Sequence, residues 1–198
     1  MEEKQPRVVL FGGPNGAGKT TVANIMLEHE FGIRDFVNAD IIARGLSMLD
    51  PDRAALAAGR IMLERLNELA AEHRDFAFES TLASRSFATR LRSLIEAGYA
   101  FHLVAIWVPS PEDSIGRIAD RVSHGGHFVP DETVRRRYAA CFKNFFSLYL
   151  PIATTWQLLD NSNASGLRTI AKGVAGREPV VVMSEIWSRI KSEFCHDD

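Results

Sequence analysis

The chain has 198 residues, of which 46% are hydrophobic and 24% are charged, and its formal net charge is −2. This size and composition are typical of one compact globular domain with a sizeable core, which we expect to span residues 1–198. The near-neutral charge argues against bulk capture of nucleic acid, and the longest apolar stretch, residues 100–108, is too short to cross a bilayer, so we expect a cytoplasmic protein without a membrane partner.

The first predicted elements flank a glycine-rich motif. Residues 8–11 predict a buried strand and residues 21–27 predict a helix. Between them lies the complete phosphate-loop pattern, a glycine, four residues and then Gly-Lys-Thr, at residues 13–20. In such a loop the backbone N–H groups face phosphate oxygens, while Lys19 supplies positive charge and Thr20 offers its hydroxyl to Mg²⁺. A glycine-rich turn that binds nothing would not require both flanking elements.

The rest of the chain alternates strands with helices. Further strands are predicted at residues 36–40, 76–79, 101–108 and 156–160, and helices at residues 51–72, 86–97 and 114–122. The tail from 166 to 198 is interpreted as a small addition with an edge strand at 179–183 and a helix at 184–194. This order predicts an α/β fold with a five-stranded, mostly parallel sheet, helices on both faces and ligands at the carboxyl ends of the strands.

Two carboxylates lie at predicted strand ends, on the same edge of the sheet as the loop. Asp40 is placed to act as a general base toward a substrate hydroxyl, and the alternative is that it caps the following helix. Glu79 would bind Mg²⁺ through water or accept hydrogen bonds from substrate, and the alternative is a salt bridge to an arginine. An alcohol that attacks a γ-phosphate in line needs a positioned base more than a covalent nucleophile, so this pattern favours phosphoryl transfer.

A pair of arginines lies on the predicted helix after the fourth strand. Arg117 and Arg121 are four residues apart, so their charges share a face that a phosphate chain would balance. The neighbouring carboxylates Asp113 and Asp120 could balance them equally well.

The segment at about 122–137 has the form of a mobile lid. Gly125-Gly126 is typical of a hinge, and Pro130 with the acidic residues after it predicts the start of a helix. That helix carries arginines at 135, 136 and 137, which are candidates for closing over the transferring phosphoryl group. The alternative is a solvated helix face that binds nothing.

These features, in this order, resemble the zeta-toxin family of P-loop kinases. The resemblance covers residues 7–165 and rests on the phosphate loop, the strand ends Asn38-Ala39-Asp40 and Phe78-Glu79-Ser80-Thr81, and the arginine-bearing lid. It implies a P-loop NTPase fold of the nucleoside-monophosphate-kinase-like, three-layer type, with ATP and Mg²⁺ as cofactors. In the best-known members the γ-phosphate passes to the 3′-hydroxyl of the amino sugar in UDP-N-acetylglucosamine. An antitoxin protein is the partner that such a toxin would have.

The resemblance, together with the wider fold, assigns roles to residues of this chain. Catalytic roles fall to Lys19, Asp40, Arg121 and Arg136. The expected ATP-binding residues, with Thr20 as the metal ligand and Arg117 stacked on adenine, are Gly13, Pro14, Asn15, Gly16, Ala17, Gly18, Lys19, Thr20, Thr21, Arg117 and Asn161. The expected acceptor-binding residues are Asp40, Arg44, Glu79, Ser80, Thr81 and Arg137. The chain departs from the family at His127, which stands where a second lid arginine is expected, so Arg136 or Arg137 would take that role.

Two functions other than a small-molecule kinase stay open. A nucleotide-dependent ATPase switch would use the strand that ends in Leu158-Leu159-Asp160. A kinase that acts on nucleic-acid ends would place the arginines at 135–137 against a phosphate backbone, which the near-neutral net charge makes the least favoured reading.

Overall fold

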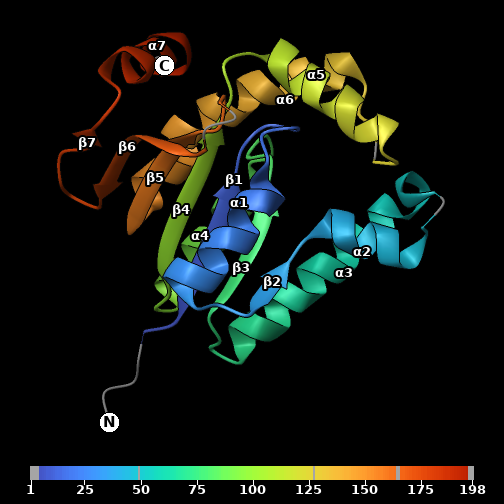
Figure 1. Ribbon diagram of the computed structural model, residues 1–198. Helices are drawn as coiled ribbons and strands as arrows, with labels where there is room; N and C mark the ends of the chain where they lie inside the picture. The colour runs from blue at the N-terminus through green and yellow to red at the C-terminus, as the bar shows by residue number, and fades with distance from the viewer. Residues whose placement is uncertain (1–4, 49, 127, 164–165, 196–198) are drawn as a thin grey trace.

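The computed structural model describes residues 5–48, 50–126, 128–163 and 166–195. At its centre is a seven-stranded sheet with the order β2-β3-β1-β4-β5-β6-β7 (Figure 1). The parallel strands are β1 (Arg7–Gly12), β2 (Asp35–Val37), β3 (Phe76–Ser80), β4 (Ala100–Trp107) and β5 (Thr155–Asp160). The antiparallel strands are β6 (Arg168–Val174) and β7 (Val180–Val181).

All of the predicted strands are present, but the sheet has seven strands rather than five. The predicted edge strand at 179–183 contains β7, and β6 was not predicted. In β6 only Ile170 and Ala171 are buried, and the residues around them are exposed or half-buried. Two adjacent buried residues make no alternating pattern, so this strand depends on its pairing with β5 and β7 rather than on a local signal.

Seven α-helices surround the sheet in the described residues. They are α1 (Lys19–Met26), α2 (Ala39–Leu46), α3 (Pro51–Ala71), α4 (Ser86–Glu96), α5 (Pro111–Ser123), α6 (Asp131–Asn144) and α7 (Ser184–Phe194). A π-helical turn, Leu27–Phe31, extends α1; after α6 come a second such turn, Phe145–Tyr149, and a 3₁₀ turn, Leu150–Ile152. None of the described helices combines the length and apolar character needed to span a bilayer.

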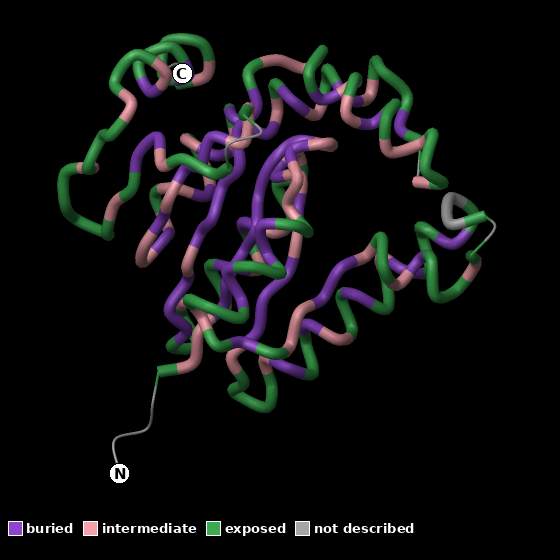
Figure 2. The backbone as a smooth tube through the Cα atoms, viewed as in Figure 1, coloured by how far each residue is buried: buried purple, intermediate pink, exposed green. Residues whose placement is uncertain are grey.

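The helices cover both faces of the sheet. In Figure 1, α1 lies in front of the central strands, and α4 lies behind them. Strands β1 and β4 run through the purple interior of Figure 2, and every residue of β4 except His102 is buried. Such nearly continuous apolar strands are expected of a parallel sheet covered on both sides, because neither face meets water.

Two helix pairs flank the carboxyl end of the sheet. The pair α2–α3 stands on one side of the opening above β1, and the pair α5–α6 stands on the other (Figure 1). Helix α5 ends in a tight cap, in which Gly125 has φ +80° and the Gly126 N–H donates to the Arg121 carbonyl at 2.9 Å. The two glycines predicted as a hinge therefore terminate α5, as glycines commonly do at helix C-termini.

The C-terminal helix is fixed to the sheet by aromatic packing. Trp187 of α7 stacks on Trp156 of β5 with ring centroids 5.7 Å apart, and Phe194 lies 5.4 Å from the ring of Phe142 on α6. The guanidinium of Arg189 lies 5.0 Å from the ring of Trp107. Helix α7 therefore braces α6, the helix that carries the three consecutive arginines.

We expect Trp187→Ala to lower the free energy of unfolding by about 3 kcal/mol, because it removes a buried ring and leaves a cavity. Urea unfolding followed by circular dichroism measures this change. The matched control is Val182→Ala, since Val182 is 61% exposed and its loss should cost less than about 0.5 kcal/mol. Equal losses in the two variants would contradict the packing role of Trp187.

Candidate functional site

The loop between β1 and α1 has the backbone of a phosphate-binding loop. Gly16 and Gly18 have φ of +76° and +87°, a region that other residues rarely adopt. A Cβ atom at Gly18 would lie 2.6 Å from Nδ2 of Asn161, and one at Gly16 would lie 2.7 Å from the carbonyl oxygen of Ser114. Asn161 also donates to the Ala17 carbonyl at 2.8 Å. The loop is therefore held between α5 and the segment after β5, which contains Asn161.

Lys19 lies at the start of α1, with its amine inside the curl of the loop. Its Nζ donates to the carbonyl oxygens of Gly13 and Pro14, both at 3.0 Å. Burial lowers the pKa of Lys19, while the carboxylates of Glu79 and Asp40 act in the opposite direction. This ammonium group is thus a positive charge held against the backbone of the loop.

Glu79 is a half-buried carboxylate beside that ammonium. The register of β1 with β3 pairs Phe11 with Glu79, which places the carboxylate next to the start of the loop. Burial raises the pKa of Glu79, against the opposing effects of Lys19 and of hydrogen bonds from the Thr20 and Asn38 side chains. Its Oε1 atom is buried without a hydrogen-bond partner. No ion pair in the described part of the chain involves Glu79, so the alternative of a salt bridge to arginine is wrong.

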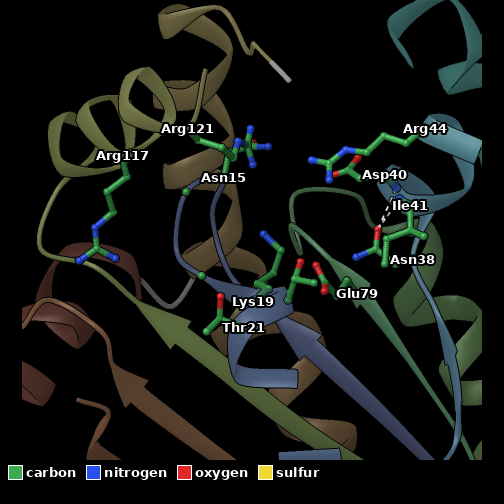
Figure 3. Close-up of a pocket in the computed structure, with 13 residues that line it drawn as sticks. Asn15, Lys19, Thr21, Asn38, Asp40, Ile41, Arg44, Glu79, Arg117 and Arg121 are labelled. Carbon is green, nitrogen blue, oxygen red and sulfur yellow. Dashed lines mark hydrogen bonds between the residues drawn. The ribbon is translucent and has the colours of Figure 1, made fainter. Parts of the chain in front are cut away.

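The helix cap that Asp40 could have formed is formed by Asn38. The Asn38 side-chain oxygen accepts hydrogen bonds from the N–H groups of Asp40 (2.8 Å) and Ile41 (3.2 Å). Asp40 therefore lies in the first turn of α2 with an exposed side chain, and its carboxylate is not used for capping. The nitrogen end of the buried Asn38 amide points toward Glu79 (Figure 3). One amide thus links the backbone of α2 to the carboxylate at the end of β3.

A first cavity of about 300 Å³ opens over the phosphate loop. Figure 3 shows Arg44 of α2 and Arg121 of α5 reaching into it from opposite sides, above Lys19 and Glu79. Its lining comprises Asn15, Gly16, Gly18, Lys19, Thr20, Thr21, Asn38, Asp40, Ile41, Arg44, Glu79, Arg117 and Arg121.

A second cavity of about 490 Å³ shares several polar residues with the first. Both cavities are lined by Asn15, Lys19, Asn38, Asp40 and Glu79. The remaining walls come from α3, α4, Arg137 and the end of β3, and consist of Ala39, Ala55, Leu56, Gly59, Arg60, Met62, Leu63, Ser80, Thr81, Ser84, Ser86, Phe87 and Arg137. The polar residues shared by the two cavities thus lie where the two cavities meet.

The arginines predicted for the site are distributed unequally. Arg117 donates to the Asn161 carbonyl at 2.5 Å and is not ion-paired with Asp113 or Asp120. Arg137 donates to the Asn15 side chain at 3.4 Å, which brings α6 to the loop. Arg136 is exposed and lines neither cavity, so its predicted place in the site is not observed.

Three other residues with predicted roles, Arg135, Asp160 and His127, are not observed in the site. Arg135 pairs with Glu112 on the surface at 3.1 Å. Asp160, which the switch hypothesis needs, is fully buried, accepts from Ser162 N–H at 2.8 Å and pairs with Arg168, and it lines neither cavity. His127 lies outside the described residues, so its comparison with a lid arginine stays a prediction.

Neither Asn38 nor the apolar wall of the second cavity was predicted to be part of the site. An asparagine two residues before Asp40, at the start of a predicted helix, is a capping signal that could have identified it. Leu56 and Leu63 are seven residues apart on α3, which is a second apolar face beside the stripe that packs inward. Phe87 on α4 carries no such signal, because only the fold brings it opposite α3.

The sheet order and the loop define the fold as that of P-loop NTPases with kinase-like relatives. The family model AAA_33, described as an AAA domain, matches residues 8–143, so the chain belongs to this family. An uncharacterized protein of Haemophilus influenzae is 30% identical over 134 residues, which cover 68% of this chain and 94% of that protein.

Solved structures share the fold at lower identity. The AvrRxo1-ORF1:-ORF2 complex with ATP has a TM-score of 0.74 and 16% identity, covering 94% of this chain, which spans only 63% of that chain's length. A structure from the PezAT chromosomal toxin-antitoxin system of Streptococcus pneumoniae has a TM-score of 0.68 and 19% identity, covering 100% of this chain and 82% of that chain. Kinases are also among the structures with this fold. At these identities the likeness establishes the fold alone.

We expect Glu79→Gln to raise the free energy of unfolding at pH 7 and to change it little near about pH 4. The folded state raises the pKa of Glu79, so its stabilising contribution is present below the pKa of the unfolded chain and is lost as pH rises through the folded pKa. Glutamine keeps the shape and removes the charge. Urea unfolding at both pH values measures the difference. The control is Glu64→Gln on the exposed surface of α3, and equal effects of the two changes would contradict the burial of Glu79.

We expect Asn38→Asp to lower the free energy of unfolding by about 1–2 kcal/mol at pH 8 and by much less at pH 5. Aspartate still caps α2 but loses the amide donor and adds a negative charge beside Glu79. The two carboxylates repel each other only when both are ionised. Urea unfolding at the two pH values tests this. An unchanged free energy of unfolding at both pH values would mean that Asn38 is only a helix cap.

Proposed function

We propose that the protein is an ATP-dependent kinase that transfers the γ-phosphate of ATP to a hydroxyl group of a small-molecule acceptor. The observation that carries this proposal is the pair of cavities that meet at Lys19, Asp40 and Glu79. One cavity contains the phosphate loop, and the other has a different lining and reaches the same carboxylates. A phosphotransferase needs this arrangement, because donor and acceptor must meet at one reacting phosphorus.

The first cavity is assigned to ATP. Backbone N–H groups of the loop would bind the phosphates, and Lys19 would balance the charge on the β- and γ-phosphates. Arg117 and Asn161 lie together beside the loop, and we assign them to the edge of the adenine site. Arg121 lines the same cavity and would contact the phosphate chain as charge shifts toward ADP.

The residues beside the loop also fit Mg²⁺. Mg²⁺ prefers oxygen ligands, and Thr20 and Glu79, whose side chains are hydrogen-bonded to each other, both line the first cavity. Thr20 would hold the ion directly and Glu79 would hold it through water. When bound, Mg²⁺ neutralises charge on the transferring phosphate.

Asp40 is assigned as the general base. The acceptor hydroxyl would lie in the second cavity and pass its proton to the Asp40 carboxylate, while its oxygen forms a bond to the γ-phosphorus. The bond from that phosphorus to the β–γ bridging oxygen breaks, and ADP leaves. Asn38 fixes α2 by its cap, so it positions Asp40 through the backbone. Arg137, which reaches Asn15, takes the lid role in place of Arg136.

UDP-N-acetylglucosamine and an antitoxin partner are finer parts of the proposal. They are supported by the resemblance in the phosphate loop, the two strand ends and the lid, and by the fold shared with a toxin-antitoxin structure. The chain spans 63% of the AvrRxo1 chain that it matches, so the activity of a whole relative is not transferred with the fold.

No observation favours the two other functions. The switch would need Asp160 in the nucleotide site, but this carboxylate is buried and paired with Arg168. A nucleic-acid-end kinase would need the consecutive arginines on one free strip. Arg135 instead pairs with Glu112, and Arg137 contacts Asn15.

We expect Asp40→Asn to lower acceptor phosphorylation by about 10²- to 10⁴-fold, because the proton acceptor is lost. ATP affinity should stay within about twofold, since Asp40 would not bind the triphosphate. The assay incubates the full chain with Mg-ATP and either UDP-N-acetylglucosamine or a bacterial metabolite extract, and mass spectrometry detects the gain of a phosphoryl group. Asp120→Asn on exposed α5 is the matched control. Full activity of Asp40→Asn would remove Asp40 as the base, and ATP binding without any phosphorylated product would remove the kinase assignment.

A further inference from the structure

The wall of the second cavity away from the two carboxylates is apolar and partly open to solvent. Leu56 and Leu63 on α3 are 72% and 39% exposed, although both line the cavity. Across from them, Phe87 at the start of α4 is held against Phe78, with ring centroids 5.1 Å apart. These side chains do not belong to the inward stripe of α3, whose members Ala58, Met62, Leu66 and Leu69 are buried in the protein. The wall is therefore an apolar surface that the protein itself does not cover.

Gly59 of α3 is another feature of this wall, and it does not depend on the exposed apolar side chains. It lies in the interior of α3, where a glycine costs about 0.5–1 kcal/mol relative to alanine. No heavy atom lies within 4 Å of the position that a Cβ atom would occupy, so neither backbone conformation nor packing requires glycine there. The open space beside Gly59 belongs to the second cavity. Because Gly59 has no side chain, this part of the second cavity has room for a ligand.

We propose that the acceptor carries an apolar or aromatic body that lies on Gly59, between Leu56 and Leu63 on one side and Phe87 on the other. Its reacting hydroxyl lies at the inner end of the cavity, beside Asp40 and Glu79. The inference rests on the proposed kinase function and replaces UDP-N-acetylglucosamine, the acceptor suggested by the resemblance, with an apolar or aromatic acceptor. Arg60 of α3 lines this cavity together with Lys19 and Arg137, so the site can also accommodate an anionic group of the acceptor.

Burial of an aromatic ring against this wall should dominate the affinity for the acceptor. Removing a phenyl-sized apolar surface from water changes a binding constant by about ten- to a hundredfold. An apolar acceptor would also displace water from the space above the two carboxylates, which strengthens their interaction with the reacting hydroxyl.

The test uses pairs of acceptors that share the reacting group and differ in the apolar body. Glycerol is compared with 3-phenylpropane-1,2-diol, and D-glucose with phenyl β-D-glucopyranoside, with UDP-N-acetylglucosamine as the diphosphate reference. Acceptor-dependent release of ADP from Mg-ATP is measured with the full chain. We expect each phenyl compound to reach half-maximal rate at a concentration at least about tenfold below that of its parent. Two results would overturn the inference while leaving the kinase assignment in place. One is an equal half-saturating concentration for the two members of each pair. The other is a half-saturating concentration for UDP-N-acetylglucosamine that is lower than those of the phenyl compounds.

Gly59→Leu is the variant that fills the proposed site. It should remove the preference for the phenyl compounds and leave ATP affinity unchanged, while the helix gains stability from the loss of glycine. Gly116→Leu is the matched control, because Gly116 also lies inside a helix with open space around it and lines neither cavity. Retention of the preference in Gly59→Leu would contradict the proposed position of the apolar body.

A binding measurement separates failure of this inference from failure of the kinase assignment. The fluorescence of 1-anilinonaphthalene-8-sulfonate, an aromatic probe with one negative charge, is titrated without ATP into the native chain and the two variants. We expect its affinity to fall at least about fivefold in Gly59→Leu and to be unchanged in Gly116→Leu, because burial of one ring carries this much affinity. If no acceptor raises ADP release but the probe shows this pattern, the kinase assignment fails and the apolar site stands. Equal probe binding by all three proteins would contradict the apolar site itself.

Discussion

The structure depends on one electrostatic constraint, the placement of a lysine and a glutamate near each other at the carboxyl ends of β1 and β3, where burial disfavours both charges. Lys19 is bound by two loop carbonyls, and Glu79 keeps a carboxyl oxygen without a hydrogen-bond partner. Burial disfavours the charged form of both groups, so each opposes folding unless the other, or a ligand, is beside it. Proteins place such costs where binding or catalysis needs them. A polyanion with its divalent cation would satisfy both groups at once.

The surrounding fold keeps this pair in position and gives it two neighbours of different chemistry. The adjacency of β1 and β3 fixes the loop against the end of the strand that carries Glu79. Asn38 then attaches α2 to the same point, which brings Asp40 to the boundary between the cavities. On the other side, α5 and α6 contribute Arg117, Arg121 and Arg137. The pair α5–α6 therefore contributes arginines beside the loop, whereas α3 contributes Leu56, Gly59 and Leu63 to the wall of the second cavity. This asymmetry is the reason for assigning donor and acceptor to separate spaces.

Local signals in the sequence predicted the parts of the fold that depend on local physics. The phosphate loop was identified because its glycines, Lys19 and Thr20 are adjacent in the chain, and the longer helices were identified because their periodicity is strong. Helix α2 was expected only in the alternative in which Asp40 caps it, because its first two residues were interpreted as the end of a strand. Strand β6 was missed because two adjacent buried residues carry little pattern and its position depends on β5. The choice between Arg136 and Arg137 depends on the rotation of α6 relative to the loop, which a run of three arginines does not encode. The walls of the second cavity come from residues 55–63 and 80–87, and only the packing of α3 against the sheet brings these segments together. Lid motion and the roles of individual site residues stay predictions.

The central claim is that the nucleotide and the acceptor occupy different cavities on either side of Lys19, Asp40 and Glu79. The most direct measurement is a crystal structure of the full chain with Mg²⁺ and a non-hydrolysable ATP analogue. The account predicts the triphosphate on the loop, its terminal phosphate beside Lys19, its adenine next to Arg117 and Asn161, and the space between Leu56, Leu63 and Phe87 free of nucleotide. A nucleotide base bound in that second space, or phosphates bound away from Lys19, would contradict it.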